Sequence, residues 1–195
     1  MQYLNLKSLL LLFFLLPFLS GCALVVAGGV AAGVGTGVAM SQDRRTSGMF
    51  VEDQSIEFRS GRLIAEKFGS DVHVNATSFN RNVLLTGEAS SETIKEEIGD
   101  LVSSVENVRN VTNEIIVGSP SSFAARSNDI LITSLVKGRF MDVGPFQANH
   151  VKVVTEGSVV YLLGLVNGQE AENATEIARL TNGVNKVVKV FEYIE

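Results

Sequence analysis

The sequence has one cysteine, two histidines, three prolines and no tryptophan among its 195 residues. A single cysteine excludes a disulfide framework, and so few cysteines and histidines exclude a Cys/His zinc site. The formal net charge is −5, so the chain lacks the basic surplus of a DNA-packaging protein and nucleic acid is not an expected partner. Charge is also scarce locally, because residues 1–40 contain a single charged side chain, Lys7.

The first 22 residues read as an export signal. Lys7 precedes an apolar run over residues 9–19, which has the length of a signal-peptide core and is too short for a confident membrane span. The string Leu19-Ser20-Gly21-Cys22 follows and resembles the bacterial lipobox. That resemblance implies cleavage after residue 21 and acylation of Cys22 on its sulfur and its new amino group. The alternative is a plain secretory signal with an incidental cysteine. The next residue is Ala23, and an Asp at this position would retain a lipoprotein in the inner membrane. The absence of Asp therefore resembles the pattern of lipoproteins exported to the outer membrane, where the protein would face the periplasm.

Residues 22–50 are interpreted as the acylated cysteine and a Gly/Ala-rich tether. Residues 23–40 are uncharged and include five glycines, which favours a flexible tether over a membrane-spanning helix, although a span stays possible. Arg44 and Arg45 follow, and they either touch lipid headgroups or are solvated.

The rest of the chain is an internal duplication, with one copy over residues 51–119 and the other over residues 120–195. Each copy has the order helix, strand, strand, helix, strand, and the second strands both end at a glycine, Gly87 and Gly164. This order predicts an α+β fold: two tandem αββαβ domains, each a mixed three-stranded sheet with two helices on one face. The opposite sheet faces would then pack on the sister domain or on a partner.

The strand-end glycine, the following helix and the third strand resemble the BON domain. Two such domains behind a lipobox resemble the dual-BON outer-membrane lipoproteins of the DolP type. The resemblance is strongest in the second copy, in the strings Ser127-Asn128-Asp129, Val151-Lys152-Val153, Gly164-Leu165-Val166 and Gly183-Val184. It implies a lipid-anchored protein that supports envelope integrity, acts at division sites, and binds anionic phospholipid through the first helix of the second domain.

Catalytic chemistry is not expected. His73 and His150 each lie at the start of a predicted strand, without Cys, Asp or Glu at ligand spacing, and are interpreted as packed or solvated histidines. The serines lack the strained G-x-S-x-G turn that exposes a nucleophile. The sequence therefore predicts no enzyme activity, no cofactor, no metal and no catalytic residue.

The first helices of the two copies differ. In the first copy, residues 53–68 carry an apolar stripe, with Glu57, Arg59, Arg62 and Glu66 facing solvent. In the second copy, the helix predicted over residues 130–141 is apolar nearly all round, with Ile132, Val136 and Phe140 facing the core. Its charged residues, Lys137 and Arg139, are both basic.

The second apolar side of that helix is the candidate binding site, because a small domain has no interior on both sides of a peripheral helix. The predicted lipid-binding residues are Ile130, Leu131, Ser134, Leu135, Lys137, Gly138, Arg139 and Met141. Two alternatives remain: the patch packs against the other domain, or it docks on a protein, which would make the chain a periplasmic adaptor for an envelope assembly machine. The sequence leaves the oligomeric state open.

Overall fold

The computed structural model describes residues 43–195, which lie in one compact unit. The signal peptide, Cys22 and the tether up to residue 42 lie outside the described residues. Between residues 43 and 195, no helix is both long enough and apolar enough to cross a bilayer.

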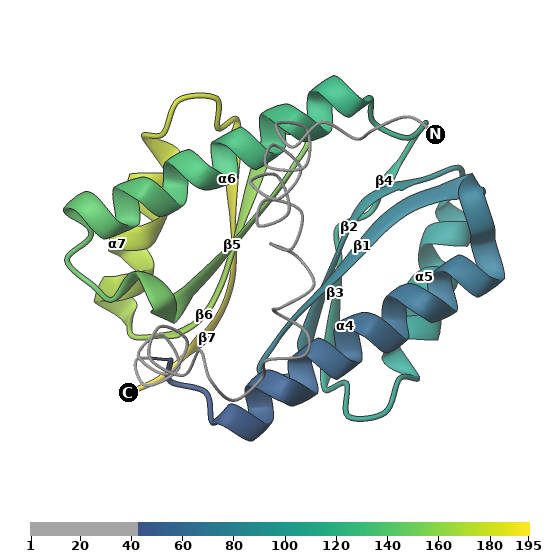
Figure 1. Ribbon diagram of the computed structural model, residues 1–195, viewed down its shortest axis with the longest axis horizontal. Helices are drawn as coiled ribbons and strands as arrows, with labels where there is room; N and C mark the ends of the chain where they lie inside the picture. Colours follow the sequence, from purple (N-terminus) through teal and green to yellow (C-terminus); the bar gives the residue numbers. More distant parts are fainter. Residues whose placement is uncertain (1–42) are drawn as a thin grey trace, which may run out of the picture. The chain divides into compact units, whose positions relative to one another are not determined.

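The first domain has the predicted order of elements. Helix α4 (Ser47–Phe68) is followed by the antiparallel strands β1 (Val72–Phe79) and β2 (Asn82–Ala89), and then by helix α5 (Glu92–Ser103). The third strand is parallel to β2 and is divided into β3 (Asn110–Asn113) and β4 (Ile116–Val117). Figure 1 shows α4 and α5 on the same face of this sheet.

The second domain repeats this topology without the break. Helix α6 (Phe123–Val143) leads into strands β5 (Val151–Glu156) and β6 (Val159–Val166), then helix α7 (Gly168–Arg179) and strand β7 (Lys186–Tyr193). Strand β6 lies in the centre, antiparallel to β5 and parallel to β7. The predicted α+β architecture of two αββαβ units is therefore confirmed.

Both first helices begin earlier than predicted. Thr46 Oγ1 accepts a hydrogen bond from Met49 N at 3.2 Å, and Ser122 Oγ accepts one from Ala125 N at 3.2 Å. These side chains cap α4 and α6 by satisfying backbone N–H groups of the first turn. The helices thus start at the cap and not at the first residue of the apolar pattern, and residues 47–50 of the predicted tether are helical.

The two glycines in the second strands have a steric role. The sequence had suggested that both second strands end at their glycines. This is wrong, because β2 continues to Ala89 and β6 to Val166. A Cβ atom on Gly87, where φ is +114°, would lie 1.9 Å from the carbonyl oxygen of His73. At Gly164 it would lie 2.4 Å from the carbonyl oxygen of His150. Both positions require glycine because the neighbouring strand passes too close for a side chain.

The side chains of the central strands alternate between two cores. Val83 and Leu85 of β2 pack under the helices of the first domain, and Val160 and Leu162 of β6 pack under those of the second. The intervening residues form a third cluster that joins the helix-free faces of the two sheets; its buried members are Phe79, Leu84, Tyr161 and Leu163. The sheet faces therefore pack on the sister domain, which is one of the two outcomes that the sequence left open.

Candidate functional site

Helix α6 is held to its own sheet by one buried face. Ile132, Val136 and Phe140 are almost fully buried, as predicted, in the core of the second domain. Asp129 is also buried, and its carboxylate accepts hydrogen bonds from Gly157 N at 2.9 Å and Ser158 N at 2.8 Å. These contacts fix the rotation of α6 about its axis, and with it the set of residues that face away from the sheet.

The face directed away from the sheet is apolar and exposed. Ile130 is 69% exposed, Leu131 56%, Leu135 42% and Met141 74%. Ser134 is exposed between them, with Oγ donating to the carbonyl oxygen of Ile130 at 2.9 Å. Within the described residues, these side chains are not packed beneath the first domain, which was one of the alternatives left by the sequence.

One aromatic residue belongs to this face and was missed by the sequence analysis. Phe123, the first residue of α6, is 81% exposed and lies two helical turns before Ile130. At about 100° per residue it shares its direction with Met141. Ser122 as a helix cap was the signal that could have revealed it. We use "the α6 exposed face" for the set Phe123, Ile130, Leu131, Ser134, Leu135, Lys137 and Met141, all of which are exposed.

The basic residues of α6 are placed differently from one another. Lys137 is exposed. Arg139 is half-buried, and its Nη1 donates to the carbonyl oxygen of Leu180 at 2.6 Å, beyond the end of α7. Leu180 is itself exposed, so it extends the apolar surface beside the C-terminal half of α6. Gly138 is half-buried, and a Cβ atom added to it would meet nothing within 4 Å.

The first helix of the first domain has no equivalent face. Asp53 matches Asp129, because its carboxylate accepts hydrogen bonds from Asn80 N and Arg81 N, both at 2.8 Å. Counted from these two aspartates, the positions of Ile130, Leu131 and Leu135 are taken in α4 by Gln54, Ser55 and Arg59.

Helix α4 nevertheless differs from the water-facing helix that was predicted. Phe58 and Val51 are exposed. Glu57 is half-buried and not a simple solvent-facing residue: its Oε1 lies 2.7 Å from Lys152 Nζ and accepts from Ser78 N at 2.8 Å. Arg59 pairs with Glu52 and Glu106. Single exposed apolar residues of this kind are common on soluble domains.

For Arg45 the solvated alternative is wrong, because its side chain is only 7% exposed, whereas Arg44 is exposed as that alternative expects. Contact of either arginine with lipid headgroups stays a prediction. Arg45 bridges Asp43 and the buried Asp53, with Nη1 2.8 Å from Asp53 Oδ2, and its guanidinium lies over the ring of Phe79. Arg44 Nη1 lies 2.7 Å from Glu170 Oε2 and also donates to the carbonyl oxygen of Leu165. Both arginines are therefore engaged within the protein, because buried or half-buried carboxylates need a cationic partner.

The Arg44–Glu170 contact changes the acidity of the carboxyl group. Hydrogen bonds from Arg44, together with those at the start of α7, lower the pKa of Glu170 to about 2 despite partial burial. His150 Nδ1 lies 3.4 Å from Glu170 Oε1, so this histidine is packed, as predicted, although beside a carboxylate.

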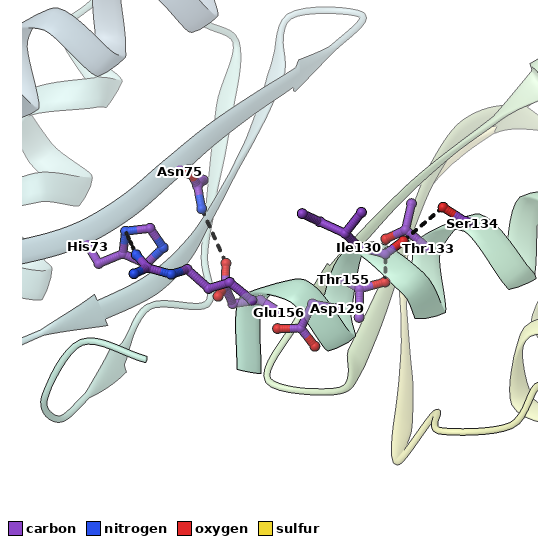
Figure 2. Close-up of a pocket in the computed structure, with 9 residues that line it drawn as sticks. His73, Asn75, Asp129, Ile130, Thr133, Ser134, Thr155 and Glu156 are labelled. Carbon is purple, nitrogen blue, oxygen red and sulfur yellow. Dashed lines mark hydrogen bonds between the residues drawn. The ribbon is translucent and has the colours of Figure 1, made fainter. Parts of the chain in front are cut away.

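A cavity of about 370 Å³ adjoins the first half of α6. Figure 2 shows His73 and Asn75 of the first domain on one side of it, with Asp129, Ile130, Thr133, Ser134, Thr155 and Glu156 of the second on the other. Glu156 is buried, and burial raises the pKa of its carboxyl group, with the charge of Glu88 adding to the effect. His73 is thus not isolated in space, although nothing near it in sequence indicated a partner.

Known proteins share this repeated architecture. The family model of the BON domain matches residues 53–119 and 128–195. The chain is 37% identical over 194 residues to the outer membrane lipoprotein DolP of Haemophilus influenzae, and the match covers 97% of both chains. The chain belongs to the dual-BON outer-membrane lipoproteins.

More distant relatives share large parts of the sequence. The 21 kDa hemolysin of Actinobacillus pleuropneumoniae is 32% identical over 78% of this chain and 80% of its own. The osmotically-inducible protein Y of Escherichia coli is 26% identical over 72% of each chain. None of these names describes an enzyme. For this dual-BON lipoprotein, the predicted family is confirmed, whereas the lipid-contact residues remain a prediction.

Proposed function

We propose that this dual-BON lipoprotein docks on anionic phospholipid through the α6 exposed face, while acyl chains on Cys22 anchor it in the outer membrane on the periplasmic side. In this role it supports envelope integrity and acts at division sites, without catalysing a reaction. The observation that carries the proposal is the row of exposed apolar side chains on one face of α6.

The size of the apolar surface supports weak, reversible docking. Phe123, Ile130, Leu131, Leu135 and Met141 are all between 42% and 81% exposed. Complete burial of one such side chain contributes roughly 1.5–3 kcal/mol. Partial burial of five in the headgroup boundary would hold a soluble domain only loosely. An anchor at Cys22 would raise the effective concentration of α6 at the bilayer, so weak docking would suffice.

The charge distribution favours the second domain as the one that meets an anionic surface. Residues 120–195 carry eight acidic and seven basic side chains, whereas residues 51–119 carry twelve and six. Lys137 is exposed on the docking face, where a cation near an anionic leaflet contributes about 1 kcal/mol. Asp142 is exposed at the end of α6 and opposes this attraction.

Vesicle flotation of residues 43–195, the unit that contains all three cores, tests the proposal without the acyl anchor. The wild-type unit should float with phosphatidylglycerol vesicles more than with phosphatidylcholine vesicles. Leu131→Glu and Met141→Glu should each reduce the floated fraction by about tenfold, since each loses an apolar contact and adds a repelled charge.

Phe58→Glu on α4 is the matched control, because it places the same charge at an exposed apolar position of the sister helix. It should float as the wild type does. If Leu131→Glu and Met141→Glu also float normally, the α6 exposed face is not the lipid site. Crosslinks from position 131 to a protein, indifferent to lipid charge, would then favour the adaptor function.

A further inference from the structure

Three side chains of types that can ligate a metal converge beside the cavity next to α6. They are His73 and Glu88 of the first domain and Glu156 of the second, and one potential ligand atom from each lies within 4.8 Å of the other two. The register of the β1–β2 hairpin explains the first pair, because His73 and Glu88 are directly opposite each other. Glu156 is the last residue of β5 and is brought to them from the second domain.

The carboxylates of this cluster are incompletely satisfied by the protein. Glu88 Oε2 is buried and has no hydrogen-bond partner among the described residues. Glu156 is only 6% exposed and receives a hydrogen bond from Asn75 Nδ2 at 3.3 Å, which Figure 2 shows. A buried carboxylate oxygen without a donor is costly, and two neighbouring carboxylates repel each other. Both costs are removed by a cation placed between them.

The nearby charges favour a cation over an anion. Glu88, Glu156 and Asp129 face the region, against the guanidinium of Arg126. Arg126 Nη1 lies 3.3 Å from His73 Nδ1, and because a guanidinium can only donate, this ring nitrogen is the acceptor of the contact. Arg126 thus uses the same ring that a metal would use, and the two cations compete for it.

We propose that His73, Glu88 and Glu156 form a binding site for a divalent transition-metal ion of the Zn²⁺ type, which links the two BON domains. One imidazole nitrogen and two carboxylate oxygens are a ligand set that Zn²⁺ accepts, and the adjoining cavity leaves room for water at a fourth position. The two carboxylates balance the charge of the ion. Binding displaces Arg126 from His73.

Calorimetric titration of ZnCl₂ into the full chain in detergent micelles tests the site. One Zn²⁺ should bind per chain and raise the melting temperature, because the ion binds the folded state across both domains. His73→Gln and Glu156→Gln should each weaken Zn²⁺ binding at least tenfold. Arg126→Gln should tighten it, which is a gain that misfolding could not produce.

His150→Gln is the matched control. His150 also lies beside a carboxylate, that of Glu170, but within the described residues it does not belong to a group of three potential metal ligands. It should bind Zn²⁺ as the wild type does. Absence of binding by the wild type would overturn the proposal. So would equal losses in His73→Gln and His150→Gln, or unchanged binding in His73→Gln. Lipid docking does not require the metal, so vesicle flotation should be the same with and without EDTA. This measurement separates failure of the metal site from failure of lipid docking.

Discussion

At the scale of single residues, one buried aspartate in each domain connects the first helix to the hairpin. Asp129 accepts from the backbone N–H groups of Gly157 and Ser158, where both residues have positive φ. Such turns match the twist of a two-residue hairpin but leave N–H groups pointing inward. A carboxylate from the helix satisfies them, so helix and hairpin are positioned together.

Asp129→Ala should therefore lower the free energy of unfolding by about 3 kcal/mol, because it leaves two backbone donors without their charged acceptor. Denaturant unfolding measures the change. Asp142→Ala, at an exposed position of the same helix, should change stability by less than about 0.5 kcal/mol. Equal effects of the two substitutions would show that the buried hydrogen bonds of Asp129 are not important for stability.

The Arg44–Glu170 contact makes a pH-dependent contribution. The pKa of Glu170 is lowered to about 2 in the folded protein, mainly by hydrogen bonds from Arg44, against an ordinary value of 4.5. The unfolded state therefore binds the proton more readily. The contribution to stability is complete above about pH 4.5 and is lost as the pH falls towards 2.

Glu170→Gln should remove this dependence. Unfolding measured between pH 5 and about pH 2 should show a shallower loss of stability for Glu170→Gln than for the wild type. Glu172→Gln, an exposed neighbour on α7, should keep the wild-type slope. A Glu170→Gln curve parallel to the wild type across this range would contradict the assigned role of Arg44.

At the scale of elements, the sequence predicted the order of helices and strands because the apolar periodicity of each is strong. It missed the helix starts, since Thr46 and Ser122 cap α4 and α6 before that periodicity begins. It therefore missed Phe123 on the α6 exposed face. The exposed positions of Ile130, Leu131 and Met141 were predictable, because Ile132, Val136 and Phe140 define the buried side.

The glycines of the central strands can be tested against a glycine with no such constraint. Gly87→Ala should destabilise the protein by more than about 1 kcal/mol, because its Cβ would meet the His73 carbonyl oxygen and its φ is +114°. Gly61→Ala in α4, where a Cβ meets nothing within 4 Å, should stabilise it by up to about 1 kcal/mol. Thermal unfolding of both variants should therefore shift in opposite directions, and shifts of the same sign would contradict this explanation.

At the scale of the whole molecule, the contacts between the domains were the least predictable part. The topology predicted that each sheet has a second face without helices, but not whether the sister domain or a partner covers it. Leu84 and Tyr161 pack in one cluster, and Lys152 pairs with Glu57. The meeting of His73 with Glu156 likewise depends on packing between residues 83 positions apart, which no local pattern reveals.

The central claim is that the exposed surfaces of the two first helices have different surroundings: the α6 exposed face contacts lipid, whereas the exposed residue Phe58 of α4 stays in water. Nitroxide labels on Leu131→Cys and Phe58→Cys of the full acylated chain, bound to phosphatidylglycerol vesicles, test it directly by their collision rates with oxygen and with a water-soluble nickel chelate. The label at position 131 should gain access to oxygen and lose access to nickel, while the label at position 58 stays accessible to nickel. Equal accessibility to nickel at the two positions would contradict lipid docking by α6.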